Sequence, residues 1–206
     1  ASDSPSVRSP YQGANPISDI WALKAIEMVS NNIVKAYEDP DDISAKGEML
    51  LAATFAGFGF GNAGVHLPHG MSYPVAGRVK EFLPNDYPKG HSMVPHGMSV
   101  ILNAPAVFRF TAPSNPKRHL HAAKLLGADI DGANLEDAGE ILADSIIALI
   151  RKIGIPNGLN GVGYNSNDID DLVEGTMPQQ RVVRLSPRSV NKEDIRNIFI
   201  DSMKLW

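Results

Sequence analysis

A five-residue sequence that contains a histidine occurs twice in this chain of 206 residues. Pro68-His69-Gly70-Met71-Ser72 recurs as Pro95-His96-Gly97-Met98-Ser99. Proline is favoured in the first turn of a helix, so we expect each histidine to lie near a helix N-terminus. The positive end of the helix dipole disfavours imidazolium there, and the neutral imidazole is the form that binds metals. His69 and His96 are therefore predicted to supply two ligands of a divalent-metal site.

Two histidines do not complete a catalytic metal site. Catalytic zinc usually has three protein ligands, and non-haem iron sites also include a carboxylate, so further ligands must come from elsewhere. His66 and Tyr73 lie three residues before and four residues after His69, a helical spacing that lets all three border one pocket. The alternative is that His69 and His96 only hydrogen-bond backbone groups at the starts of two helices.

Three other segments are weaker candidates. Gly59–Gly64 matches G-x-G-x-x-G, but the preceding residues have helical rather than strand spacing, so we expect glycines that allow close helix packing or end a helix. His119 and His121 would point to different sides of a helix and are interpreted as surface residues. Residues 179–184 carry two arginines next to a proline and could contact an acidic ligand.

Hydrophobic spacing predicts an all-α fold of seven to nine helices. Residues 1–16 are rich in Ser, Pro, Gly and Asn and are predicted to be an extended arm or linker, followed by a single helical domain over residues 17–206. Helices are expected at 22–37, 43–58, 135–153, 168–174 and 192–203. Only residues 181–185 (RVVRL) are predicted to be extended.

Composition excludes several classes of protein. The chain has 19 Lys and Arg against 23 Asp and Glu, with no basic tract, which argues against nucleic-acid binding. It has no cysteine, so disulfides, thiolate metal sites and cysteine nucleophiles are excluded within this sequence. No apolar run approaches 18 residues, so no membrane contact is expected. A cytoplasmic location is expected, with the mitochondrial matrix as the alternative.

At these motifs the chain resembles a known family. Residues 55–74 (FAGFGFGNAGVHLPHGMSYP) and 94–97 (VPHG) are similar to the helical C-terminal domain of iron-containing (group III) alcohol dehydrogenases. Further matches span most of the chain: residues 11–21 (YQGANPISDIW), 126–129 (LGAD), 163–164 (GY), 175–179 (GTMPQ) and 202–206 (SMKLW). The resemblance implies the dehydroquinate synthase-like fold of that family.

The resemblance also implies roles for particular residues. In the family the metal lies between an N-terminal nucleotide-binding domain and the helical domain, held by one Asp and three His. By motif, His69 and His96 correspond to the last two histidine ligands, and the other two ligands are expected upstream of this chain. Phe60 resembles a residue that lines the nicotinamide and substrate pocket. Tyr73 is the candidate catalytic residue. It stands where most members have a histidine, so the proton relay of those members does not carry over to it unchanged.

The implied activity is metal-dependent hydride transfer with NAD as cofactor and iron as the metal, zinc being the alternative. The residues quoted above are closest to the branch that passes hydride from a hydroxy acid, such as 4-hydroxybutyrate, to an oxo acid, such as 2-oxoglutarate. The implied partners are that small substrate and the N-terminal nucleotide-binding domain, and the chain could form a homo-oligomer. Without its nucleotide-binding domain the chain is expected to be inactive. A non-catalytic helical interaction module with structural histidines is the alternative.

Overall fold

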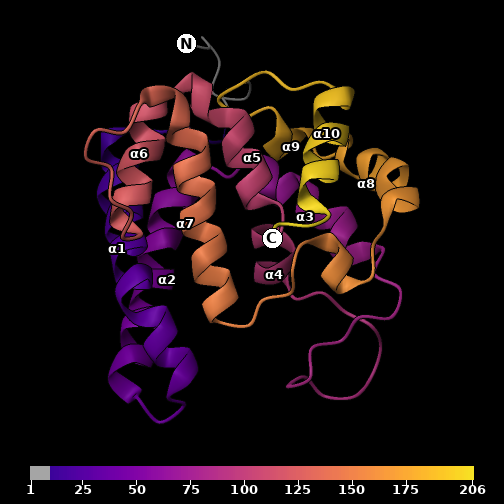
Figure 1. Ribbon diagram of the computed structural model, residues 1–206, viewed down its shortest axis with the longest axis horizontal. Coiled ribbons are helices and arrows are strands. Elements are labelled where there is room, and N and C mark those ends of the chain that lie inside the picture. The colour runs from indigo at the N-terminus through magenta and orange to yellow at the C-terminus, as the bar shows by residue number, and fades with distance from the viewer. Residues whose placement is uncertain (1–9) are drawn as a thin grey trace. The chain divides into compact units, whose positions relative to one another are not determined.

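The computed structural model describes residues 10–206, which fall into two compact units divided between Val65 and His66. All regular secondary structure in this part of the chain is helical, which confirms the predicted all-α class (Figure 1). Of the predicted arm, residues 1–9 lie outside the described residues. The expectation that residues 17–206 form one domain stays a prediction.

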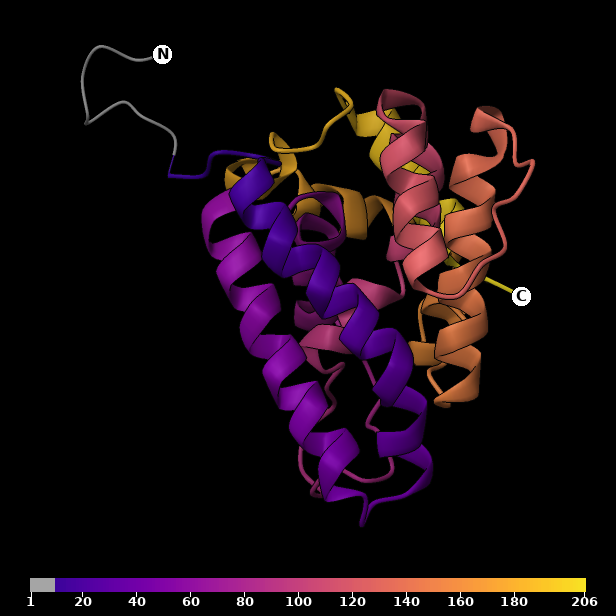
Figure 2. The same cartoon turned by 90° about the vertical axis from the view of Figure 1, so that its left-hand side faces the viewer.

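The first unit contains two helices that run antiparallel to each other, α1 (Pro16–Glu38) and α2 (Ile43–Ala63) (Figure 2). Both begin after a residue whose side chain caps the helix. The side chain of Asn15 accepts hydrogen bonds from two backbone N–H groups of α1, and the Asp42 side chain accepts one from Ala45 at 2.8 Å. The ring of Trp21 packs edge-on against Phe55 and Phe58, with centroids 5.2 and 5.3 Å away.

The glycine-rich segment is the end of α2, not a phosphate-binding loop after a strand. A Cβ on Gly59 would lie 3.3 Å from the Ser18 carbonyl oxygen and from Ala22 Cβ, so this glycine lets α1 approach closely. Gly64 follows the helix with φ +86°, a conformation that L side chains rarely adopt. Close packing and helix termination, as predicted from the sequence, therefore explain both glycines.

The second unit contains the remaining helices (Figure 1). These are α3 (Leu67–Gly77), α4 (His96–Ile101), α5 (Ala104–Thr111), α6 (Pro116–Leu125), α7 (Ala138–Lys152), α8 (Ile169–Thr176), α9 (Gln180–Val183) and α10 (Lys192–Ser202). Short 3-10 turns occupy Ala112–Ser114, Leu135–Asp137, Leu159–Val162 and Ser166–Asp168. The helix predicted to start at Leu135 thus begins as a 3-10 turn and becomes α-helical at Ala138.

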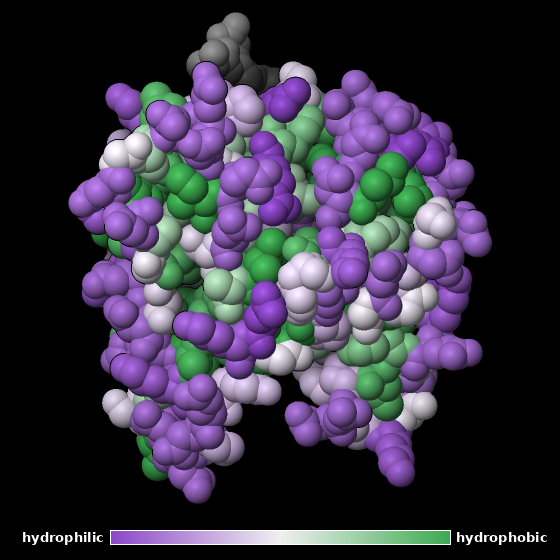
Figure 3. All heavy atoms as spheres, viewed as in Figure 1, coloured by the Kyte–Doolittle hydropathy of each residue, from purple (hydrophilic) through white to green (hydrophobic). Residues whose placement is uncertain are grey.

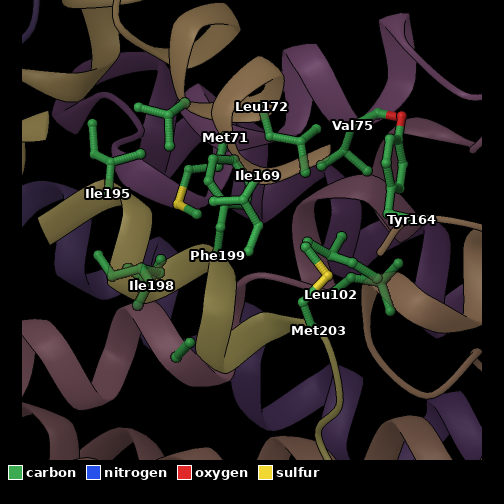
Figure 4. Close-up of a cluster of buried hydrophobic side chains, with 14 of the residues drawn as sticks. Met71, Val75, Leu102, Tyr164, Ile169, Leu172, Ile195, Ile198, Phe199 and Met203 are labelled. Carbon is green, nitrogen blue, oxygen red and sulfur yellow. The ribbon is translucent and has the colours of Figure 1, made fainter. Parts of the chain in front are cut away.

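The core of this unit fixes the orientation of α3. Leu67, Met71 and Val75 follow one another at intervals of four residues and are fully buried. Met71 packs with Leu172 of α8 and Phe199 of α10 in the hydrophobic cluster shown in Figure 4. Burying such side chains stabilises the fold by about 1.5–3 kcal/mol each. Successive α-helical residues are 100° apart, so positions two residues along from this buried stripe lie on the opposite face of α3.

The prediction of an extended segment is wrong. Residues 181–185 are not extended, because Val182 and Val183 lie in the helical turn α9 and are buried. The hydrophobic environment outweighs the β-propensity of these valines, and the described residues offer no strand for them to pair with. The described residues contain ten α-helices, or nine without the four-residue turn α9, and nine is the upper end of the predicted range.

The prediction that His119 is a surface residue is also wrong. Its side chain is buried, and both ring nitrogens have partners: Nε2 lies 3.0 Å from Thr111 Oγ1 and Nδ1 lies 2.9 Å from the Asn115 carbonyl oxygen. Burial lowers the pKa of His119, although the Asn115 bond opposes the change. His121, two residues on, is exposed as expected.

The face drawn in Figure 3 is mostly hydrophilic, with smaller hydrophobic areas between the polar side chains. Among residues 10–206 no single helix is long and apolar enough to cross a membrane, although α2 and α3 pass that test when taken together as a broken pair.

Candidate metal and substrate site

The repeated five-residue sequence folds locally in the same way at both places. Each histidine lies at the start of a helix, His69 in the first turn of α3 and His96 as the first residue of α4. Three residues later a buried serine hydroxyl donates to the histidine's own carbonyl oxygen, at 2.7 Å for Ser72 and 2.8 Å for Ser99. The predicted position of both histidines at helix N-termini is therefore confirmed.

The two imidazoles are neighbours. Their ring centroids are 5.4 Å apart and the ring planes are inclined by 57°. Metal–nitrogen distances of about 2.1 Å at a tetrahedral angle would put two ligating imidazoles about 5 Å apart, centroid to centroid. The observed separation therefore fits a pair of nitrogen ligands to one metal ion.

The environment keeps the first imidazole neutral. Burial lowers the pKa of His69, and the nearby His96 lowers it further. Within the described residues neither side chain forms a hydrogen bond, in contrast to His119, whose two ring nitrogens are both bonded. The arrangement of His69 and His96 is thus that of potential ligands rather than of histidines that satisfy backbone groups.

His66 lies close by without joining the pair. Burial is the main cause that lowers its pKa to about 4, and the nearby His69 and His119 contribute. Its Nδ1 is buried and has no hydrogen-bond partner among residues 10–206, and its ring lies 6.4 Å from that of Phe108. No group of three or more His, Asp or Glu in this part of the chain could hold a metal, so His66 is not positioned as a third ligand.

Close approaches by neighbouring helices hold α3 in place. A Cβ on Gly70 would lie 2.8 Å from Val183 Cγ2 of α9, and a Cβ on Gly175 of α8 would lie 2.6 Å from Pro74 Cβ. The Tyr164 hydroxyl donates to the Val75 carbonyl oxygen at 2.7 Å, and burial raises the pKa of Tyr164 to about 12. The helix that carries His69 is therefore fixed along most of its length.

Tyr73 lies one turn after His69, on the face of α3 opposite the buried stripe, and is 44% exposed. Its hydroxyl oxygen accepts a hydrogen bond from Arg181 Nη2 of α9 at 3.3 Å. The two arginines of residues 179–184 gave only a weak signal in the sequence. The contact depends on α9, which was predicted to be extended, so the sequence did not connect Arg181 with Tyr73.

Phe60 belongs to the other unit. It lies in the last turn of α2 and its side chain is half exposed. An exposed aromatic ring at this position is available to a ligand, and its predicted role beside the nicotinamide stays a prediction.

The chain is similar to known proteins over nearly its whole length. Residues 11–203 match the model of the iron-containing alcohol dehydrogenase family, C-terminal domain, and the chain belongs to this family. It is similar to hydroxyacid–oxoacid transhydrogenases named as mitochondrial. It is 49% identical over 203 residues to the probable enzyme of Dictyostelium discoideum and 50% identical over 202 residues to that of Rattus norvegicus.

The matches cover 98% of this chain but 37% and 43% of those relatives, so the chain spans about two fifths of their length. Solved structures are similar as well. A 1,3-propanediol oxidoreductase superposes with a TM-score of 0.81 at 27% identity, covering 93% of this chain and 46% of that one. An alcohol dehydrogenase from Oenococcus oeni gives 0.82 at 25%, covering 94% and 47%. The predicted fold is confirmed.

Proposed function

We propose that this chain is the metal- and substrate-binding half of a hydroxyacid–oxoacid transhydrogenase. The hydroxy acid would lose a hydride from its carbinol carbon and a proton from its hydroxyl group. The oxo acid would gain both, on its carbonyl carbon and oxygen. One substrate is thereby oxidised and the other reduced, and NAD in the full enzyme is the carrier between them. 4-Hydroxybutyrate and 2-oxoglutarate are the proposed substrate pair.

The observation that carries this proposal is the pair of imidazoles 5.4 Å apart, each at the start of its own helix. When bound, a divalent metal, iron first and zinc as the alternative, supplies Lewis acidity toward the substrate oxygen. His69 and His96 would hold it through neutral ring nitrogens, and the low pKa of His69 keeps that ring ready at neutral pH. An Asp and a further His from outside this chain would complete the ligand set.

Two further residues have proposed roles. Tyr73, one turn along α3 from His69, would border the bound substrate and present its hydroxyl oxygen on that side of the helix. Phe60 would present an apolar ring to the nicotinamide and exclude water from it. We also propose a mitochondrial location in place of the cytoplasmic one, because both transhydrogenase relatives reported above carry that word in their names.

Isotope transfer in the whole protein tests the proposal. 4-Hydroxybutyrate deuterated at its carbinol carbon is supplied with 2-oxoglutarate, and the product 2-hydroxyglutarate is examined by mass spectrometry. We expect deuterium at its carbinol carbon without release of reduced nucleotide into solution. Stoichiometric release of NADH without any need for an oxo acid would instead identify an ordinary dehydrogenase. The isolated chain of residues 1–206 is expected to be inactive in the same assay.

A non-catalytic helical module is the alternative. It would need His69 and His96 to have structural partners like those of His119, and the described residues provide none. Full activity of the whole protein with both histidines replaced by alanine would support that alternative.

A further inference from the structure

A guanidinium group lies beside the candidate site. Arg181 Nη2 donates to the hydroxyl oxygen of Tyr73, and Tyr73 is one helical turn from His69. Residues four apart on a helix have Cβ atoms about 6 Å apart, so the imidazole, the phenol and the guanidinium follow one another along one side of α3.

The backbone fixes this arrangement. Gly70 lies between His69 and Tyr73 in sequence, and a Cβ there would lie 2.8 Å from Val183 Cγ2 and 3.4 Å from Val182 Cγ2. Both valines are buried and belong to the same four-residue turn as Arg181. The turn that carries Arg181 is therefore packed against the turn of α3 that carries His69.

Arginine is well suited to recognise a carboxylate. Its guanidinium is a planar fork of N–H donors that matches the two oxygens of a carboxylate. We propose that Arg181 determines specificity by binding the substrate carboxylate that is farthest from the reacting carbon. This proposal rests on the proposed function. Tyr73 is the residue that positions the guanidinium of Arg181.

One arginine at a fixed place serves both substrates. In 4-hydroxybutyrate two methylene groups separate the carbinol carbon from the carboxylate. In 2-oxoglutarate two methylene groups likewise separate the carbonyl carbon from the distal carboxylate. A donor and an acceptor that alternate in the same site then place their reacting carbons at the same point, because each is held at the same distance from Arg181.

The test compares Arg181→Met with Arg184→Met in the whole protein. Arg184 is an exposed arginine one turn further along, and the described residues give its side chain no partner near the histidines. Each variant is assayed with 4-hydroxybutyrate and with its neutral isostere 4-hydroxybutyramide. We expect Arg181→Met to raise KM for the acid by about 10- to 100-fold and to change kcat/KM for the amide by less than about twofold. Arg184→Met should behave as the wild type.

Binding supplies a readout other than turnover. Glutarate, a dicarboxylate without a reacting group, should bind the wild type in calorimetry and at least about tenfold more weakly to Arg181→Met. Arg181→Lys keeps the charge but not the fork, so it should weaken binding by an intermediate factor. If Arg181→Met does not fold, the same measurements on Arg181→Lys test the proposal.

The outcomes separate the two proposals. Wild-type protein that does not turn over 4-hydroxybutyrate would contradict the proposed function. Wild-type turnover of the acid together with an unchanged KM in Arg181→Met would overturn the role of Arg181 alone. Equal losses for the acid and the amide would also overturn it, because they would show a structural role.

Discussion

A Cβ atom on Gly70 would lie 2.8 Å from Cγ2 of Val183, so the backbone of the helix that carries His69 packs closely against a side chain of the turn that carries Arg181. Val183 is buried, and its β-branched side chain has little freedom to rotate away. The Gly70 position therefore links the stability of the fold to the geometry of the candidate site.

Replacing Gly70 by alanine should destabilise the protein by about 1–3 kcal/mol through this overpacking. The matched control is Gly97→Ala in the second copy of the motif, where a Cβ would meet nothing within 4 Å. Alanine there should be neutral or slightly stabilising, because it favours helix over glycine. Chemical denaturation of both variants measures the difference, and equal stabilities would contradict the close contact.

Replacing His69 or His96 by alanine should remove metal from the whole protein. With one of two neighbouring imidazoles absent, we expect metal content below about a tenth of the wild type and a comparable or greater loss of activity. Elemental analysis after dialysis measures the first and the isotope assay the second. His121→Ala, at an exposed position, is the control and should retain both. Full metal content in either histidine variant would contradict the ligand assignment.

The buried His66 should make the metal-free protein less stable in mild acid. The folded state lowers the pKa of His66 from 6.5 to about 4, so below pH 6.5 the unfolded chain binds the proton more readily. The contribution of His66 to the free energy of unfolding is therefore fully present above pH 6.5. It is lost as the pH falls toward 4, by up to about 1.4 kcal/mol per pH unit.

His66→Phe removes that titration and also the buried Nδ1 that has no partner. Its free energy of unfolding should fall less steeply between pH 6.5 and 4.5 than that of the wild type, while His121→Phe should leave the slope unchanged. Parallel slopes in the wild type and His66→Phe would show that His66 is not the responsible group.

The C-terminal residues should depend on Asn157. Its Oδ1 accepts from the backbone N–H groups of Leu205 and Trp206, at 2.8 and 3.1 Å, and its Nδ2 donates to the Trp206 carbonyl oxygen. Asn157→Ala leaves these part-buried groups unsatisfied and should cost about 1–3 kcal/mol. The Asn160 side chain is exposed in the same loop, so Asn160→Ala should have little effect.

Hydrogen exchange at Leu205 and Trp206 distinguishes the two variants. Exchange should accelerate in Asn157→Ala and stay slow in Asn160→Ala, whose backbone bond from Asn160 to the Met203 carbonyl oxygen is retained. Protection at the C-terminus that survives the loss of the Asn157 side chain would contradict this prediction.

Local signals in the sequence predicted much of the fold. Asp42 begins α2 because its short polar side chain bonds a nearby backbone N–H group, an interaction that needs no distant partner. Residues 181–185 were misjudged for the opposite reason. Their valines have β-propensity, but their conformation depends on packing against Gly70, which is more than a hundred residues away.

The same division applies to the candidate site. The residues with the right chemistry could be recognised from the sequence, because the repeated Pro-His-Gly motif places an imidazole at each of two helix starts. The folded arrangement was needed to show that the two rings are neighbours 5.4 Å apart, that His119 is buried and bonded, and that Arg181 reaches Tyr73. The physical reason is that such distances are set by how helices far apart in the sequence pack against a shared core, and no local pattern records them.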